Sequence, residues 1–292
     1  MAENQHVGII YSPWVEEAEP LANTLVDALS KEHKPWVCSV LDLEGNSDMA
    51  KRCSTFVTIG GDGTILRTVR LAAPAGIPIV GVNLGRVGFM AELPAEEAVA
   101  RVNSFASGEG WMEERTMLEA KILPVRQSTK KLLSYSGLND AVVSRTKPSR
   151  MVYVEVRVDK HSLASYAADA VIVSTATGST GYALGAGGPI LYAESTSLLV
   201  QPVVPQLADS AAIVLHPGAV VEIEIEADQD AMVSVDGYMD LDLSPGDTVR
   251  VEEGPHKAKF LRQGSPHTLP SALSHRLSSI RRQRNRDTTS GD

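Results

Sequence analysis

A glycine-rich turn between two apolar segments constrains the fold of this chain more than any other feature. Residues 56–59 (Phe-Val-Thr-Ile) predict a buried strand, residues 60–64 read Gly-Gly-Asp-Gly-Thr, and residues 65–71 predict the start of a helix. Three glycines let the backbone turn sharply and let a ligand approach without a side chain in the way. A strand that leads through such a turn into a helix is typical of an α/β domain, in which ligands bind at the carboxyl ends of the strands.

The rest of the first hundred residues follows the same alternation. Short apolar runs at 7–11, 36–41 and 77–82 predict further strands. Residues 14–29 predict a helix, because their apolar side chains recur on one helical face. Strands separated by helices form a parallel sheet with helices on its faces. We therefore predict an N-terminal α/β domain over residues 1–103.

The pattern changes to period two farther along the chain. Residues 151–158 and 219–226 alternate apolar and polar side chains, and shorter runs at 247–251 and 257–261 are similar. Such alternation, with turn residues between the runs, predicts an antiparallel β-rich domain, which we assign to residues 104–270. Residues 271–292 predict a short helix and a basic tail.

Composition narrows the class of protein. The 292 residues are 43% hydrophobic, and no apolar run reaches the roughly 18 residues of a membrane span. The net charge of −9 argues against a nucleic-acid partner, because proteins that bind nucleic-acid backbones are usually basic. Two cysteines, Cys38 and Cys53, are too few for a disulfide framework and lie in or beside apolar stretches. We expect a cytoplasmic protein with buried free thiols and no signal peptide.

The glycine turn also carries a chemical prediction. Backbone N–H groups at a strand-to-helix turn suit phosphate oxygens, yet Asp62 lies in the middle of this turn. A carboxylate there would repel a phosphate unless it held Mg²⁺ or accepted a proton, which suggests phosphoryl transfer to a hydroxyl group. Taken alone, the turn is also compatible with a tight bend before a helix that starts with aspartate. It lacks the Gly-Lys-Ser/Thr of a P-loop and the spacing of a dinucleotide-binding motif.

Three other segments have candidate binding chemistry. Asn139 and Asp140 could read a base edge and a ribose hydroxyl, although an Asx-turn explains the dipeptide in isolation. Residues 169–189 run from an apolar strand into hydroxyls and glycines; Thr177 could cap a helix or hold an anion, and Tyr182 offers a ring for a base. Residues 83–89, which end at Phe89, predict either a substrate wall or a loop with a buried aromatic anchor.

In their order and spacing these segments resemble the NAD kinase family, over roughly residues 7–261. The string Ala-Gly-Gly-Pro-Ile at 186–190 is a distinctive part of the match. The resemblance implies an all-β, sandwich-like C-terminal domain that binds NAD. It implies transfer of a phosphoryl group from ATP or polyphosphate to the 2′-hydroxyl of the adenosine ribose of NAD, with Mg²⁺ or another divalent cation. It also implies a homodimer or homotetramer. From the net charge and the lengths of the apolar runs, we expect no nucleic-acid or membrane partner.

The resemblance assigns roles residue by residue. Asp62 is the implied catalytic base, and no metal ligand is identified. The implied nucleotide- and substrate-binding residues are Gly61, Gly63, Thr64, Arg67, Phe89, Asn139, Asp140, Arg150, Asp169, Thr177, Thr180, Gly181, Tyr182, Ala183, Leu184 and Gly185.

Five positions depart from the family pattern, and two alternatives stay open, the second of them suggested by Ala167, Gln206 and Tyr238. The five positions are Ala167, Ala176, Gly181, Gln206 and Tyr238. The first alternative is a lipid or sugar kinase with the same Gly-Gly-Asp-Gly-Thr turn. The second is a regulator that binds a nucleotide but has lost catalysis, which would bind NAD without producing NADP.

Overall fold

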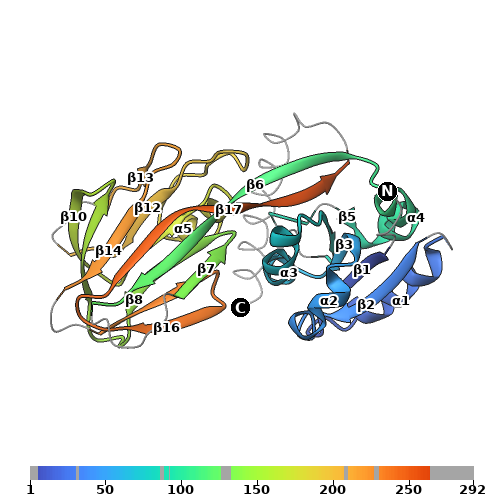
Figure 1. Cartoon of the computed structure of the whole chain (residues 1–292), viewed down its shortest axis with the longest axis horizontal. Helices are drawn as coiled ribbons and strands as arrows, with labels where there is room; N and C mark the ends of the chain where they lie inside the picture. The colour runs from blue at the N-terminus through green and yellow to red at the C-terminus, as the bar shows by residue number, and fades with distance from the viewer. Residues whose placement is uncertain are drawn as a thin grey trace, which may run out of the picture. The chain divides into compact units, whose positions relative to one another are not determined.

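The computed structural model describes residues 6–30, 33–85, 89–91, 93–125, 133–206, 210–226 and 230–263. The chain divides into two compact units (Figure 1). The first unit comprises Met1–Glu113 with Lys259–Asp292, and the second comprises Glu114–Ala258.

The first unit is built on a parallel sheet in the order β2-β1-β3-β4. The central strand β3 is buried along nearly its whole length, as expected for a strand covered on both faces. The short strand β5 continues the parallel pairing beside β4, and Phe260 near the end of β17 pairs with Ile79 of β4. The bounds are β1 His6–Tyr11, β2 Lys34–Ser39, β3 Cys53–Ile59, β4 Ile79–Asn83, β5 Leu93–Pro94 and β17 Thr248–Arg262.

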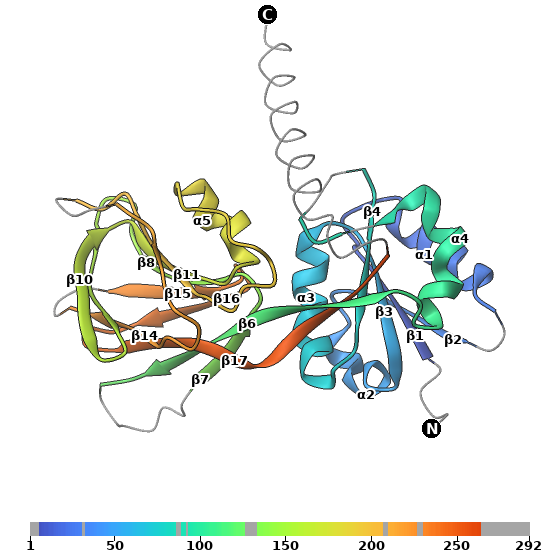
Figure 2. The same cartoon turned by 90° about the horizontal axis from the view of Figure 1, so that it is seen from above.

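Helices cover both faces of this sheet (Figure 2). The helices α1 and α4 pack on one face, where Leu25 and Phe105 meet Val57 and Val80. The helices α2 and α3 lie on the other face (Figure 2). The bounds are α1 Ala18–Ala28, the 3-10 turn η1 Glu44–Asn46, α2 Ser47–Ala50, α3 Asp62–Ala75 and α4 Ala95–Ala106. The predicted α/β architecture is therefore confirmed, although the helix predicted over 14–29 begins only at Ala18.

The second unit consists of two antiparallel sheets. One has the order β10-β9-β14-β17, and β6 pairs with both β17 and β7. The other has the order β13-β12-β11-β8-β15-β16. The strands of these two sheets, apart from β17, have the bounds β6 Trp111–Leu123, β7 Leu133–Gly137, β8 Asp140–Arg145, β9 Val152–Val158, β10 His161–Ala168, β11 Ala170–Ser174, β12 Leu199–Val203, β13 Ile213–Val214, β14 Val221–Ile225, β15 Ala231–Val235 and β16 Met239–Leu243.

Alternating side chains create the core of the second unit. Val154 of β9 and Val173 of β11 belong to one buried cluster, to which strands of both sheets contribute. The sandwich-like all-β architecture is thus confirmed. The outer face of the six-stranded sheet has a smaller cluster, in which Ala183 of the short helix α5 (Tyr182–Gly185) packs with Ile172 and Leu199.

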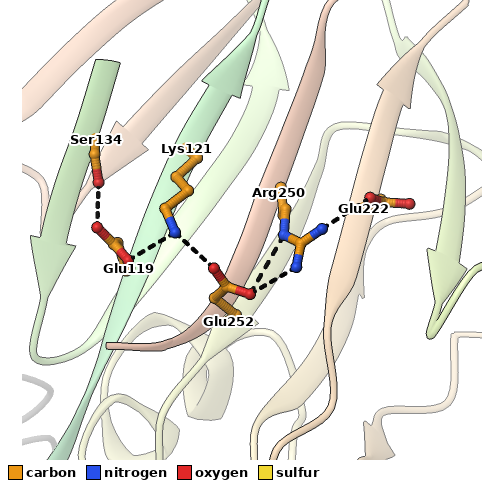
Figure 3. A network of polar contacts seen from close by, with 6 residues as sticks. All are labelled: Glu119, Lys121, Ser134, Glu222, Arg250 and Glu252. Atoms are coloured by element: carbon orange, nitrogen blue, oxygen red, sulfur yellow. Dashed lines mark hydrogen bonds and ion pairs between the residues drawn. The ribbon is translucent and has the colours of Figure 1, made fainter. Parts of the chain in front are cut away.

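The outer face of the other sheet is charged rather than apolar (Figure 3). Lys121 lies 2.7 Å from Glu252 and 3.0 Å from Glu119, and Arg250 lies 2.9 Å from Glu252. Ser134 donates a hydrogen bond to Glu119 at 2.5 Å. Polar side chains at alternate positions of these strands are typical of a sheet with one face in the core and the other in solvent.

The division by contacts differs from the boundaries expected from the sequence, 1–103, 104–270 and 271–292. Residues 104–113 and 259–263 belong to the first unit, and within the latter segment Phe260 pairs with Ile79 of β4. The predicted strands at 247–251 and 257–261 are one continuous strand, β17. The predicted helix and basic tail at 271–292 lie outside the described residues.

Two further expectations concern burial. Cys38 and Cys53 are buried free thiols, as predicted, and burial raises the pKa of Cys53 to about 12. Among the described helices, none has the length and apolar character needed to cross a membrane.

Candidate functional site

The glycine turn lies at the carboxyl end of β3 and the N-terminus of α3. Gly60 has a φ of +149°, and a Cβ there would lie 2.5 Å from the Thr64 hydroxyl and 2.9 Å from the Cβ of Ser12, so this position excludes other residues. Apart from its chain neighbours and the helix backbone, a Cβ at Gly61 or Gly63 would meet no atom of the described residues within 4 Å. The protein's own packing therefore explains Gly60, whereas the other two glycines leave open space over the turn.

Asp62 is half-buried at the start of α3, and backbone donors hold its carboxylate. The N–H of Phe89 donates to Oδ2 at 2.8 Å, and the N–H of Met90 donates to Oδ1 at 3.1 Å. These contacts tie the segment after β4 to the turn after β3, as their neighbouring positions in the sheet require. A carboxylate offers about four lone-pair positions, so each oxygen keeps capacity for another donor.

Two other predicted residues share this end of α3. Thr64 is buried, and its backbone N–H donates to the carbonyl of Gly61 at 3.0 Å. The guanidinium of Arg67 lies 5.2 Å from the centre of the exposed Trp14 ring, which is a cation–π distance. The residues 86–88 of the predicted substrate wall lie outside the described residues.

A second set of predicted residues is centred on Asn139 and Asp140. The carboxylate of Asp236 accepts three backbone N–H groups, from Leu138 at 2.7 Å, Asn139 at 2.8 Å and Asp140 at 3.0 Å. Asp236 itself has a φ of +52°, in the left-handed region. Sequence reasoning missed Asp236; the Asp-Gly dipeptide between two period-two runs is the signal that could have found it.

The environment of Asp140 changes its acidity. Only 7% of the residue is exposed. Burial, and then the nearby charge of Asp236, raise the pKa of Asp140 to about 7. Near neutral pH this side chain can therefore either donate or accept a hydrogen bond.

The segment after β11 packs directly against the Asn139 turn. Thr175 donates its backbone N–H to the carbonyl of Asn139 at 2.9 Å and its hydroxyl to the carbonyl of Leu138 at 2.5 Å. A Cβ at Gly178 would lie only 2.1 Å from the Asn139 carbonyl oxygen. These contacts bring together two motifs that are more than thirty residues apart in the sequence.

The side chains of residues 177–185 differ in burial and in their hydrogen-bond partners. Thr177 is buried, and its hydroxyl has no hydrogen-bond partner among the described residues. Tyr182 is 48% exposed, whereas Ala183 packs into the apolar cluster against the sheet. Thr180 donates its hydroxyl to the carbonyl of Thr177 at 2.9 Å. Gly181 and Gly185 are exposed, and Leu184 is half-buried.

Two predicted residues lie at the far end of β8 and β11. Asp169 forms an ion pair with Arg145 at 2.9 Å, a partner that sequence reasoning did not name. Arg150 is exposed in the turn before β9. Two of the positions that depart from the family pattern are in contact: the backbone N–H of Gln206 donates to the carbonyl oxygen of Ala167 at 2.7 Å.

Comparison with known proteins places these features in a wider context. The model of the ATP-NAD kinase N-terminal domain matches residues 12–109, and that of the ATP-NAD kinase C-terminal domain matches residues 138–263. The chain is 38% identical over 259 residues to a protein named NAD kinase from Dehalococcoides mccartyi strain BAV1, covering 88% of this chain and 90% of that protein. It is 36% identical over 274 residues to the NAD kinase of Chloroflexus aggregans, covering 94% and 98%.

Solved structures have the same fold. Yeast NADH kinase complexed with NADH superimposes with a TM-score of 0.80 at 22% identity, covering 94% of this chain and 87% of that one. An NAD kinase from Archaeoglobus fulgidus in complex with ATP superimposes with a TM-score of 0.70 at 24% identity, covering 88% and 94%.

Proposed function

The chain belongs to the NAD kinase family, and from that premise we propose that it transfers a phosphoryl group from ATP to the 2′-hydroxyl of the adenosine ribose of NAD, producing NADP. The proposal rests mainly on the position and the hydrogen bonds of the Asp62 carboxylate. This carboxylate lies at a helix N-terminus, beside open backbone at Gly61 and Gly63, and two N–H groups orient it.

The chemistry follows from that arrangement. A ribose hydroxyl is a poor nucleophile, and a positioned carboxylate that accepts its proton accelerates attack by about 10²–10⁴-fold. The hydroxyl proton passes to Asp62 as the ribose oxygen bonds to the terminal phosphorus of the donor. The bond between that phosphorus and its bridging oxygen breaks, and ADP leaves with the electron pair. The N-terminus of α3, a helix of 14 residues, favours the negative charge of the phosphates.

The second set of residues suits an adenosine. The Thr177 hydroxyl is buried without a partner among the described residues, so a ligand that bonds to it would remove an unfavourable feature. Asp140 can accept from or donate to a ribose or base group, and the exposed ring of Tyr182 offers a stacking surface. In this proposal Asn139, Arg150, Asp169 and the residues 180–185 complete recognition of NAD.

In the proposed reaction, Mg²⁺ binds the phosphates of the donor. Kinases commonly bind Mg²⁺ through one or two carboxylates together with substrate phosphates. The turn fits this arrangement, because Asp62 keeps acceptor capacity and Gly61 and Gly63 leave open space. The described residues contain no cluster of three or more metal-binding side chains. When bound, the ion would offset negative charge on the transferred group.

Three finer expectations belong to the same proposal. Polyphosphate would serve as a second donor, since it offers the same phosphate chain without a base. The enzyme would assemble as a homodimer or homotetramer, which size-exclusion chromatography with light scattering measures. It would act in the cytoplasm, which fractionation of cells measures.

One assay tests the proposed reaction. Purified protein is incubated with NAD, Mg²⁺ and ATP, and NADP is detected with an NADP-specific dehydrogenase. Asp62→Asn should lower kcat by about 10²-fold or more and leave KM for NAD within about threefold. Asp48→Asn is a matched control, because Asp48 is also in the first turn of a helix of the first unit but is exposed. Failure of the wild-type protein to produce NADP would overturn the proposal, and turnover of lipids or sugars instead would favour the alternative kinases.

A further inference from the structure

A buried ion pair lies in the first unit at the end of β17. The Nε of Arg262 donates to Oε2 of Glu113 at 2.6 Å, and the two side chains are only 7% and 4% exposed. Burying two charges costs about as much as their attraction returns, so a pair of this kind is weak grounds for a purely stabilising role. The other contacts of Arg262 indicate a role for this ion pair.

The guanidinium of Arg262 has a second, different partner. Its Nη1 donates to the carbonyl oxygen of Met90 at 2.8 Å, while its Cζ lies 4.9 Å from the centre of the Phe260 ring. The backbone is also closely fitted here, because a Cβ at Gly110 would lie 2.4 Å from the carbonyl oxygen of Arg262. The planar fork of an arginine is suited to holding two acceptors at a fixed separation.

Met90 connects this pair to the candidate base. Its carbonyl accepts from Arg262, and its N–H donates to Oδ1 of Asp62 at 3.1 Å. The neighbouring N–H of Phe89 donates to Oδ2 at 2.8 Å. The chain of contacts therefore runs from Glu113 through Arg262 and Met90 to Oδ1 of the carboxylate, and the adjoining residue Phe89 holds Oδ2.

We infer that Arg262, held by Glu113, is a positioning residue that fixes the carboxylate of Asp62 through the backbone of Met90. The inference rests on the proposed role of Asp62 as the base. The side chain of Arg262 contacts Met90 rather than the carboxylate, so it acts on the orientation of Asp62. A misplacement of about 1 Å at a reacting group can lower a rate by as much as 10²-fold.

Two variants of the full chain test this inference. Arg262→Lys keeps a positive charge beside Glu113 but replaces the fork with a compact ammonium, which cannot reproduce both contacts. The double variant Glu113→Met with Arg262→Met removes both buried charges together, which buried pairs often tolerate, and so covers the case in which the single variant fails to fold. Arg250→Met is the matched control, because Arg250 is on the same strand and pairs with Glu252 on the charged outer face (Figure 3).

The readouts separate positioning from stability. In folded Arg262→Lys and in the double variant, kcat should fall about tenfold or more while KM for NAD stays within about twofold. Hydrogen exchange at the amides of Phe89 and Met90 should become about tenfold faster, a measurement that needs no kinase activity. Arg250→Met should change neither quantity.

Other results would overturn the inference. A kcat within twofold of the wild type in either folded variant would do so, and so would unchanged exchange at Phe89 and Met90. An equal loss of kcat in Arg250→Met would show a general effect of removing an ion pair. If the wild-type protein produces no NADP, the proposed function fails, whereas the exchange measurement still tests whether Arg262 holds the backbone that contacts Asp62.

Discussion

The carboxylate of Asp236 holds the backbone of Asn139, accepting its N–H at 2.8 Å although the two residues are 97 positions apart in the sequence. The same carboxylate accepts the N–H groups of Leu138 and Asp140. One side chain at the turn between β15 and β16 therefore sets the conformation of the Asn139 turn. Three charge-assisted hydrogen bonds from backbone donors are a strong local restraint.

Replacing Asp236 should weaken both folding and NAD binding. Asp236→Ala leaves three N–H groups without this acceptor, and we expect a loss of about 1–3 kcal/mol in the free energy of unfolding. KM for NAD should rise because the Asn139 turn loses its restraint. Denaturant titration and steady-state kinetics measure the two effects. Asp240→Ala is the control, since Asp240 is exposed on the adjacent strand β16; equal effects of both substitutions would contradict the prediction.

The raised pKa of Asp140 predicts a pH dependence of stability. The folded protein keeps a proton on Asp140 up to about pH 7, whereas the unfolded chain releases it near the ordinary value of 3.8. The resulting stabilisation is fully present below about pH 4 and is lost as the pH rises through 7, on the order of a few kcal/mol. Denaturant titrations from pH 4 to 8 on the wild type and Asp140→Asn test this. The difference between the two proteins should vary with pH across that window, and a constant difference would refute the prediction.

Gly63→Ala should separate stability from ligand binding. Outside its own helix backbone, a Cβ at Gly63 meets no atom within 4 Å in the part of the chain that the structure describes, and the residue lies inside helix α3. Alanine there should stabilise the protein by up to about 1 kcal/mol. If phosphates approach this backbone, KM for ATP should nevertheless rise several-fold. Gly45→Ala is the control. A Cβ at Gly45 also meets no atom of the described residues within 4 Å, but this glycine lies in η1 rather than in the glycine turn. An unchanged KM in Gly63→Ala would mean that the donor does not approach this residue.

Thr177→Val tests the buried hydroxyl that has no partner among the described residues. Valine has nearly the same shape, so we expect stability to stay the same or to rise by about 1 kcal/mol. KM for NAD should rise by about tenfold, the equivalent of one hydrogen bond to a ligand.

Thr175→Val provides the contrast to that substitution. The Thr175 hydroxyl donates to the carbonyl of Leu138 and accepts from the N–H of Gly178. Its loss should reduce stability by about 1–3 kcal/mol, because both partners are left unpaired in a buried region. Thermal denaturation compares the two variants, and a larger loss in Thr177→Val would contradict the assignment.

Much of the fold followed from local pattern. Residues 56–59 and their glycine turn predicted a parallel sheet, and the alternation at 151–158 and 219–226 predicted an antiparallel β-rich domain. These predictions held because a strand or helix must bury its apolar face, and the spacing of apolar residues records which face that is.

The long-range contacts could not be read in the same way. Arg262 meets Glu113 across 149 positions, and Gly178 meets the carbonyl of Asn139 because β11 pairs with β8. Sheet order and strand register decide which of many charged and glycine residues become neighbours, and neither leaves a local signal. The sequence pattern likewise predicted two strands at 247–251 and 257–261, whereas β17 is continuous from Thr248 to Arg262.

The amino-acid order was sufficient to predict the α/β and β-rich units, the glycine turn with Asp62 at its centre and the resemblance to a family. The orientation of Asp62, the restraint on Asn139 and the raised pKa of Asp140 come from contacts made on folding. This difference arises because periodicity and turn chemistry act over a few residues. Hydrogen-bond partners and desolvation instead depend on which distant segments the folded sheets bring together.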